Sequence, residues 1–184
     1  MTAELAEGAR HLLAAHIRDI PDWPEPGVIF KDITPLLRDA EAFTATIDAL
    51  AAAGRAADGS VAVDVVAGIE ARGFILAAPV AERLGVGFVP VRKAGKLPHH
   101  TIGTSYALEY GEATIEVHRD AFGKEDRVLI VDDVLATGGT VQACAGLVDQ
   151  AGASVAAVAV LLELRILNGR SRVGDLPFQA LLEA

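Results

Sequence analysis

The sequence predicts an α/β protein in which a mostly parallel β-sheet is flanked by helices. Apolar segments at 61–68, 86–93, 127–133 and 153–164 have the length and composition of strands. They alternate with segments of helical periodicity and are apolar on both faces, which is typical of a parallel sheet covered on two sides. Such sheets bind ligands beyond the carboxyl ends of their strands.

The elements before this sheet are less regular. Residues 3–19 place apolar side chains at helical spacing, which predicts a first helix. Residues 21–37 contain four prolines, which predicts an extended or looped segment. Residues 40–53 have the pattern of a second amphipathic helix.

The later helices have clearer ends. Residues 73–85 are predicted to be a helix that stops at Gly85, since glycine readily adopts the left-handed conformation at a helix end. A further helix is predicted to begin near Gly139. Residues 95–110 show little periodicity and are predicted to be irregular.

Composition narrows the class of protein. A length of 184 residues fits one domain over 1–184. The net charge of -9 argues against general nucleic-acid binding, which needs a basic face. The single cysteine, Cys144, excludes an internal disulfide framework and fits a reducing compartment. With no signal peptide and no apolar run of ~18 residues, a cytoplasmic protein without a membrane partner is expected.

The stretch VLIVDDVLATGGT, residues 128–140, places two adjacent carboxylates where an apolar run stops. Aspartate is rarely buried unless paired, so Asp132 and Asp133 are predicted to serve a ligand rather than form a solvated acidic turn. The Gly-rich turn from Ala136 to Thr140 leads into a helix, an arrangement whose backbone amides bind anions. Carboxylates beside an anion cradle fit a sugar phosphate. Neither a GxxxxGK[ST] loop nor a GxGxxG fingerprint occurs in the chain.

This stretch resembles the phosphoribosyl-pyrophosphate (PRPP) motif of the type I phosphoribosyltransferases. Four other segments resemble the adenine-specific members in order and spacing, namely PEPGVIFKDITPLL (24–37), GIEARGF (68–74), PVRKAGKLP (90–98) and SYALEYG (105–111). The similarity runs from about residue 16 to the C-terminus. It implies a Rossmann-like type I phosphoribosyltransferase fold with an N-terminal hood at about 1–38 and a flexible catalytic lid at about 95–110.

The resemblance implies transfer of the phosphoribosyl group from PRPP to adenine, which gives AMP and pyrophosphate. Mg²⁺ is expected to accompany the pyrophosphate, and the chain is expected to form a homodimer. Asp132 and Asp133 are expected to hold the ribose hydroxyls, directly or through Mg²⁺. The 5′-phosphate is expected to bind Ala136, Thr137, Gly138, Gly139 and Thr140.

The pyrophosphate site has two expected parts. An Arg beside glycine at a strand end is either a polyphosphate clamp or an ordinary surface Arg in a turn. The resemblance favours the clamp and implies a cis peptide bond between Glu70 and Ala71. Arg92, Lys93 and Lys96 place three cations within five positions. Such a charge run is usually only exposed to solvent, but the irregular segment that follows this one favours anion binding. The expected pyrophosphate-binding residues are Glu70, Ala71, Arg72, Gly73, Arg92, Lys93 and Lys96.

The base is expected to lie between Phe30 and Val134, although a lone Phe is usually a core residue. By the resemblance, backbone groups of Ile29 and Lys31 read the edge of adenine. Lys31 stands where relatives often have Arg, so a backbone role is favoured over a side-chain role.

The lid is expected to carry the acid/base candidate, Glu109, with Tyr110 beside it. A closing lid excludes water from a reactive sugar cation. His99 and His100 depart from the family pattern, and no third residue that would complete a metal site is evident.

Two other functions stay open. The first is a phosphoribosyltransferase for another nucleobase, against which the hood and the SYALEYG segment speak. The second is a PRPP-sensing regulator on the same fold, which needs an added recognition domain or a basic face. Turnover with individual nucleobases distinguishes all three functions.

Overall fold

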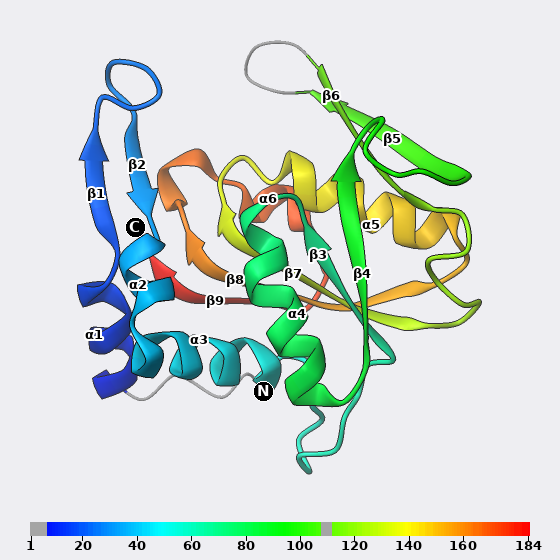
Figure 1. The fold of residues 1–184 in the computed structure, drawn as a ribbon, viewed down its shortest axis with the longest axis horizontal. Helices are drawn as coiled ribbons and strands as arrows, with labels where there is room; N and C mark the ends of the chain where they lie inside the picture. Colours follow the sequence, from blue (N-terminus) through cyan, green and yellow to red (C-terminus); the bar gives the residue numbers. More distant parts are fainter. Residues whose placement is uncertain (1–6, 108–111) are drawn as a thin grey trace.

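The computed structural model describes residues 7–107 and 112–184. Within them, a two-stranded hairpin stands beside a seven-stranded sheet of order β5-β6-β4-β3-β7-β8-β9 (Figure 1). Strands β4, β3, β7, β8 and β9 run parallel, whereas β6 pairs antiparallel with both β4 and β5. The strands are β1 (Arg18–Pro21), β2 (Ile29–Asp32), β3 (Val65–Ile69), β4 (Gly87–Lys93), β5 (Thr101–Ala107), β6 (Glu112–His118), β7 (Arg127–Leu135), β8 (Ser154–Glu163) and β9 (Phe178–Glu183).

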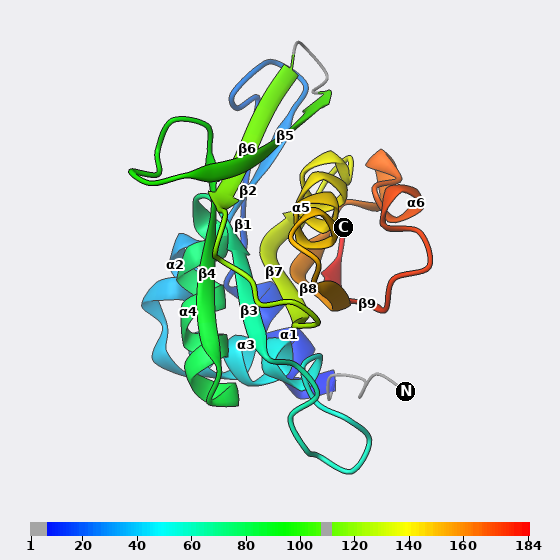
Figure 2. The same ribbon diagram turned by 90° about the vertical axis from the view of Figure 1, so that its right-hand side faces the viewer.

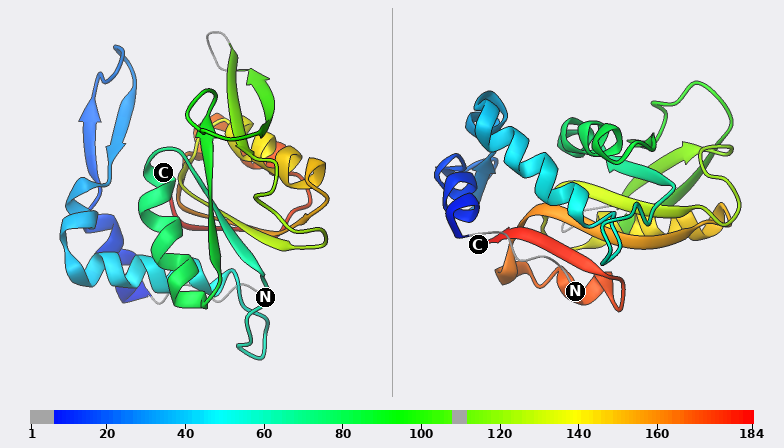
Figure 3. Two further views of the ribbon diagram at one scale, coloured as in Figure 1. Left: turned by 45° about the vertical axis from the view of Figure 1, so that its right-hand side comes forward. Right: turned by 90° about the horizontal axis from the view of Figure 1, so that it is seen from below.

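Helices cover both faces of this sheet, as the sequence predicts. Helices α3 and α4 lie on one face and α5 on the other (Figure 2; Figure 3, right). The helical elements are α1 (Glu7–Ala15), α2 (Thr34–Arg38), α3 (Ala40–Ala52), α4 (Arg72–Leu84), α5 (Gly139–Gln150), the 3₁₀ turn η1 (Arg165–Leu167) and α6 (Arg170–Val173).

Each face of the sheet has its own apolar core. In β3, Val66 belongs to the cluster that contains Leu76 of α4, whereas Val65 belongs to the cluster that contains Leu147 of α5. Successive side chains of a strand point to opposite faces, so a strand covered on both faces has to be apolar throughout. This explains the uninterrupted apolar run that predicts β3.

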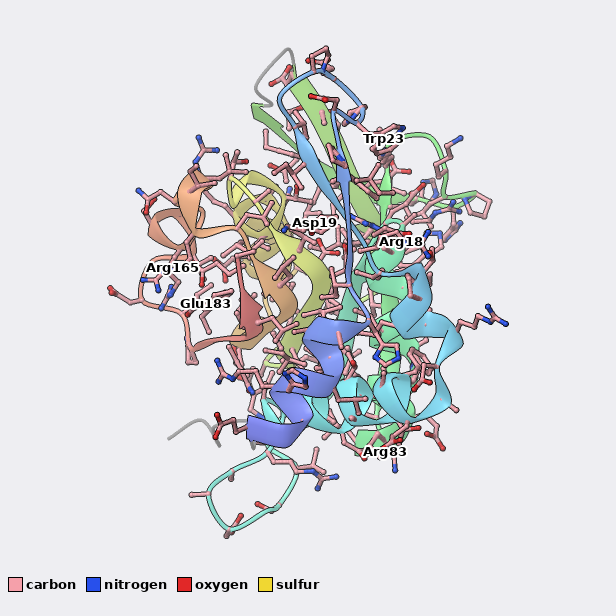
Figure 4. All side chains as sticks on the ribbon, turned by 90° about the vertical axis from the view of Figure 1, so that its left-hand side faces the viewer. Arg18, Asp19, Trp23, Arg83, Arg165 and Glu183 are labelled. Atoms are coloured by element: carbon pink, nitrogen blue, oxygen red, sulfur yellow. The ribbon has the colours of Figure 1, made fainter. Side chains whose placement is uncertain are left out.

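Two helix ends follow from their capping residues. Asp39 precedes α3 and its side chain accepts a hydrogen bond from the amide of Ala42 at 2.8 Å, which is a typical N-cap. Gly85 ends α4 with φ of 72°, which confirms the predicted glycine stop. Arg83 near that end pairs with Asp48 of α3 at 3.0 Å (Figure 4).

The prediction of one helix over 3–19 is wrong beyond Ala15. Residues 18–21 form β1 instead, because they pair antiparallel with β2, with Asp19 opposite Lys31. The Nζ atom of Lys31 also contacts Asp19 Oδ1 at 2.7 Å. The proline-rich segment that was expected to be extended or looped is this hairpin followed by α2, in which Pro35 occupies the first turn.

The bounds of two central strands also differ from the prediction. The strand expected at 61–68 begins at Val65, since Val61 makes an isolated bridge to Arg55. The strand expected to stop at residue 133 continues to Leu135, because β8 pairs with it as far as Leu135–Glu163. Asp132 and Asp133 therefore lie within β7 and not beyond its end.

Residues 95–110 are not uniformly irregular. Residues 101–107 form β5, which pairs along its whole length with β6, a strand that the sequence pattern did not predict. The segment TIGTSYA is polar and contains a glycine, so its pairing partner, rather than its composition, makes it a strand. The β5–β6 pair and the β1–β2 hairpin rise at the same end of the molecule (Figure 1; Figure 3, left).

None of the helices in the described part of the chain is long and apolar enough to cross a membrane.

We predict that Gly68→Ala weakens the packing of α4 on β3. A Cβ atom at Gly68 would lie 2.6 Å from the Cβ of Ala77 and 2.7 Å from the Phe88 ring. Such overpacking typically lowers the free energy of unfolding by about 1–3 kcal/mol. The control is Gly146→Ala in α5, where a Cβ meets nothing within 4 Å and should raise the same free energy by about 0.5–1 kcal/mol. Equal urea midpoints for the two variants would contradict this packing argument.

Candidate active site

A cavity of about 500 Å³ lies at the carboxyl ends of β3 and β7. Its wall combines β2, the turn between β3 and α4, and the end of β7. Another cavity, of about 450 Å³, is lined largely by alanines. Arg55 also lines it, but its guanidinium group donates to the backbone carbonyl of Gly59 at 3.0 Å. The first cavity is the candidate site, because it gathers three carboxylates, a guanidinium group and two aromatic rings.

More than half of the predicted site residues line this cavity. They are Ile29, Phe30, Lys31, Glu70, Ala71, Arg72, Asp132, Asp133, Val134, Ala136 and Thr140. The predicted residues that do not line it are Gly73, Thr137, Gly138, Gly139, Arg92, Lys93 and Lys96. Glu109 and Tyr110 lie outside the residues that the structure describes.

Arg72 connects the hairpin to the central strand. Its Nη2 lies 2.8 Å from Asp133 Oδ2, and its Nη1 donates to the backbone carbonyl of Lys31 at 3.2 Å. Its guanidinium carbon lies 4.8 Å from the centroid of the Phe30 ring, within the range of a cation–π contact. One side chain thus contacts the predicted base site and the predicted ribose site.

The contact between Arg72 and Asp133 is an ion pair rather than a hydrogen bond. Asp133 Oδ2 is buried, and among the described residues it has no hydrogen-bond partner of suitable geometry. The side chain of Asp133 is only 8% exposed, against 35% for that of Arg72. A buried acceptor atom that is ion-paired but not hydrogen-bonded can still accept a hydrogen bond from a ligand.

The side chain of Asp132 is held by the backbone around it. Its Oδ1 accepts the amide of Asp133 at 2.9 Å, and a Cβ atom at Gly73 would lie 2.8 Å from the same oxygen. Gly73 therefore lets the start of α4 approach β7, a role apart from the predicted pyrophosphate binding. Burial raises the pKa of Asp132 well above its usual range, and the neighbouring Asp133 raises it further. Burial also raises the pKa of Asp133, although Arg72 opposes this shift.

The predicted phosphate loop, residues 136–140, is shaped by close backbone contacts. Gly138 has φ of 80° and precedes α5, and no side chain caps this helix. The first amides of α5 are therefore left for another acceptor, and a helix N-terminus favours an anion there. A Cβ atom at Gly138 would collide with the carbonyl of Gly169, and one at Gly169 would collide with the carbonyl of Ala136. Gly169, which the sequence analysis missed, thus supports the loop, and the dipeptide Asn168–Gly169 was its sequence signal.

The second part of the expected pyrophosphate site is the cationic segment Arg92, Lys93 and Lys96, which lies beside the β3–α4 turn. Glu70 Oε2 accepts the amide of Lys93 at 2.9 Å and the Nε of Arg92 at 3.3 Å. Burial raises the pKa of Glu70, but the Lys93 amide and the Arg92 charge outweigh it and lower the pKa overall. Glu70 therefore links this segment to the cavity wall. The peptide bond between Glu70 and Ala71 is cis, as the resemblance implies.

The hairpin that corresponds to the expected hood presents its aromatic residues together. The rings of Trp23 and Phe30 meet edge to face, with centroids 4.4 Å apart. Lys31 turns its side chain to Asp19, with Nζ–O distances of 2.7 and 2.8 Å (Figure 4). Its carbonyl accepts from Arg72, so both polar ends of Lys31 have partners within the protein.

The cavity also has wall residues that sequence reasoning missed, namely Val28, Ile69, Tyr106, Leu164 and Leu167. Leu164 and Leu167 follow β8 and sit in a turn that is tied to the C-terminus. In that turn Arg165 pairs with Glu183 at 2.8 Å, and its amide donates to the carbonyl of Ala184 at 2.9 Å (Figure 4). Apolar residues after a strand carry no signal that would separate a ligand wall from a core.

His99 and His100 lie at the base of β5, with ring centroids 4.8 Å apart. The ring of His118 is 6.2 Å from that of His99. No group of three or more candidate metal ligands occurs among the described residues, so the chain there shows no metal site of its own.

We predict that Asp132→Asn stabilises the ligand-free protein. A carboxyl group with a raised pKa in the folded state favours folding only while it is protonated, so its contribution is lost as the pH rises. The gain from Asp132→Asn should therefore grow above pH ~4, to about 0.5–2 kcal/mol at pH 8.

Thermal unfolding between pH 4 and pH 9 checks the sign of this effect. Asp64→Asn is the control, because a bidentate contact with Arg127 lowers the pKa of Asp64 to about 2. Asp64 stabilises the fold above pH ~4 and loses this effect as the pH falls toward 2, so its substitution should lower the melting temperature at neutral pH. A lower melting temperature for Asp132→Asn at pH 8 would contradict the inferred burial of charge.

Known proteins share both the sequence and the fold of this chain. A family model for the phosphoribosyl transferase domain matches residues 37–175. An adenine phosphoribosyltransferase from Nocardioides sp. is 60% identical over 177 residues, which cover 96% of this chain and 95% of the relative. One from Acidothermus cellulolyticus is 62% identical over 162 residues, which cover 88% and 89%.

Solved structures give the same result. The adenine phosphoribosyltransferase of Thermoanaerobacter pseudethanolicus superposes with a TM-score of 0.89 at 47% identity and covers 95% of this chain and 99% of its own. The Saccharomyces cerevisiae enzyme, solved with an imino-altritol bisphosphate and adenine, has a TM-score of 0.91 at 37% identity and covers 96% and 100%. The type I phosphoribosyltransferase fold expected from the sequence is thereby confirmed. The chain belongs to the phosphoribosyl transferase family.

Proposed function

We propose that the chain is an adenine phosphoribosyltransferase, which transfers the 5-phosphoribosyl group of PRPP to adenine and releases AMP and pyrophosphate. The observation that carries the proposal is one cavity with a carboxylate pair, the start of an uncapped helix and an aromatic hairpin. These features suit, in order, a ribose, its 5′-phosphate and a flat base. The identity to curated adenine phosphoribosyltransferases over nearly the whole chain supports the same activity.

The reaction exchanges one bond at C1′ of the ribose. The N9 atom of adenine forms a bond to C1′ as the bond from C1′ to pyrophosphate breaks, and the proton on the imidazole ring of adenine leaves. Positive charge develops on the ribose ring in an oxocarbenium-like transition state. Asp132 and Asp133 lie in the cavity where the ribose binds, so their negative charge stabilises that ring electrostatically.

Mg²⁺ is the expected cofactor, and the residues present fit it. Mg²⁺ prefers oxygen ligands and usually binds one or two carboxylates together with substrate phosphates. Asp133 Oδ2 is a buried oxygen without a hydrogen bond, and Asp132 lies beside it in the cavity wall. When bound, the ion neutralises charge on the leaving pyrophosphate, while these two side chains hold it or the ribose hydroxyls.

The base is held by the hairpin and the end of β7. Phe30 and Val134 line the cavity, and the backbone of Ile29 and Lys31 borders it. Since the carbonyl of Lys31 accepts a hydrogen bond from Arg72, Arg72 has to shift if this carbonyl is to read adenine. The Lys31 side chain is paired with Asp19, which supports a backbone role for Lys31.

The homodimer and the cytoplasmic location stay predictions. The homodimer rests on the family resemblance. The location rests on the single cysteine, which fits a reducing compartment.

Incubation with PRPP, Mg²⁺ and each nucleobase separately tests the proposed function. Formation of AMP from adenine, with much slower turnover of guanine, hypoxanthine, xanthine and uracil, is expected. Turnover of another base alone contradicts the specificity, and no turnover together with binding of nucleic acid favours the regulator.

We predict that Asp132→Asn and Asp133→Asn both lower kcat/KM. Each loses hydrogen bonds to a charged group worth roughly 1.5–3 kcal/mol, which corresponds to ~10–150-fold. Steady-state AMP formation measures the loss, and circular dichroism checks that the fold is retained. Asp58→Asn is the control, because Asp58 bonds Ser60 away from the cavity. Full activity in both cavity variants would show that the carboxylates do not serve the ribose.

We predict that Glu109→Gln lowers kcat by ~10²–10⁴-fold, the range for general acid–base catalysis, with little change in PRPP binding. Glutamine keeps the shape and hydrogen bonding of glutamate but loses its ionisable proton. Rapid-quench kinetics measures the chemical step and calorimetry measures PRPP affinity. A collapse of PRPP affinity with an unchanged kcat would make Glu109 a binding residue and remove its acid/base role.

A further inference from the structure

Glu116 is a buried carboxylate outside the cavity wall. It lies in the middle of β6, opposite Arg92 of β4 on one side and Gly103 of β5 on the other. The residue is only 8% exposed. Within the described residues it forms no ion pair with Lys, Arg or His, since the nearest strand cation, Arg92, contacts Glu70 instead. A buried carboxylate without such a partner has to be satisfied by hydrogen bonds.

Consecutive backbone amides supply these bonds. Glu116 Oε1 accepts from the amide of Gly95 at 3.0 Å and from those of Lys96 and Leu97 at 3.3 Å each. Gly95 has φ of 78°, a conformation that favours glycine and turns the three amides toward one point. Successive amides that converge in this way form a nest of the kind that binds anions, and here the protein fills the nest with its own carboxylate.

The turn that Glu116 holds belongs to the cationic segment. Lys93 and Lys96 are exposed, and neither has an ion pair among the described residues, so their charges are available to an anion. Arg92 Nη1 donates to the carbonyl of Lys96 at 3.1 Å, and Arg92 Nε donates to Glu70. A continuous chain of contacts therefore runs from Glu116, through the turn and Arg92, to Glu70 in the cavity wall.

We infer that Glu116 is a positioning residue for the pyrophosphate end of PRPP, a role that rests on the proposed function. Its carboxylate fixes the 95–97 turn. Through the contact of Arg92 with this turn and with Glu70, it holds Lys93 and Lys96 beside the β3–α4 turn. Glu116 itself does not touch the substrate. Without the Glu116 carboxylate the turn is free to move. PRPP then has to order the two lysines when it binds, which lowers its affinity, while the base site and the chemical step stay intact.

Glu116→Gln tests this inference, because it keeps the side-chain volume and removes the charge. We expect the KM for PRPP and the Kd from calorimetry to rise about tenfold, the equivalent of ~1.4 kcal/mol. In the reverse reaction the KM for pyrophosphate should rise as well. The kcat and the KM for adenine should change by less than about twofold. A residue that only stabilises the fold would lower the melting temperature without this split between the two substrates.

Two further variants complete the experiment. Gly95→Ala strains the turn without touching Glu116, in a place where a Cβ meets nothing within 4 Å, and should raise the KM for PRPP in the same direction. It decides the matter if Glu116→Gln does not fold. Asp120→Asn removes one exposed charge after β6 and should leave both KM values unchanged.

Unchanged PRPP affinity in a folded Glu116→Gln, or in Gly95→Ala if the former does not fold, contradicts the inference. Equal losses for PRPP and adenine also contradict it. Unsubstituted protein that forms no AMP contradicts the proposed function instead, so the two failures are distinguishable.

Discussion

The ion pair between Arg72 and Asp133 is the contact on which the arrangement of the site depends. Arg72 begins α4 and Asp133 lies in β7, so the pair joins one helix layer to the central sheet at the mouth of the cavity. The same guanidinium holds the carbonyl of Lys31 and lies over Phe30, and this fixes the hairpin against the sheet. Without a cation here, the buried carboxylate of Asp133 would lie beside the half-buried carboxylate of Asp132 with no opposite charge from Arg72, and burial of such a charge is costly. One side chain thus offsets the charge of Asp133 and sets the position of the hairpin that carries Phe30.

This arrangement makes the site ready for a ligand at some expense of stability. Burial raises the pKa of both Asp132 and Asp133, so the ligand-free fold carries an electrostatic penalty at neutral pH. A ligand that brought a cation or hydroxyl donors to these carboxylates, as proposed, would relieve that penalty, and part of its binding free energy would come from this relief. The uncapped start of α5 behaves in the same way, since its first amides gain an acceptor when a phosphate binds. The buried carboxylate of Asp133, which is ion-paired but not hydrogen-bonded at Oδ2, and the uncapped amides of α5 are therefore the groups through which a ligand would stabilise the protein.

The sequence predicted the central elements well and the peripheral ones poorly, for physical reasons. Strand β8 and helix α4 are packed against other elements on well-defined faces, so their hydrophobic pattern is complete within the segment. Strands β1, β5 and β6 owe their form to a partner strand, and no pattern within RDIP or TIGTSYA specifies that partner. The Asp pair lies in the wall of the cavity, but its place inside β7 depends on pairing with β8 that continues to Glu163. Wall residues such as Leu164 and Tyr106 were missed because an apolar or aromatic side chain next to a strand predicts a core as readily as a ligand contact.

Two acidic residues organise the cationic segment that is proposed to bind pyrophosphate. Glu70 accepts from Arg92 and from the Lys93 amide, and Glu116 accepts from the amides at 95–97. Glu116 thus accepts three backbone amides, and Glu70 accepts one amide and one guanidinium group, so they fix the path of the chain and leave the ammonium groups of Lys93 and Lys96 exposed. A salt bridge to either lysine would have neutralised the charge that an anion needs. Carboxylates that bind backbone amides position the chain and do not neutralise nearby lysines. A net charge of -9 is therefore compatible with a substrate that carries phosphate and pyrophosphate.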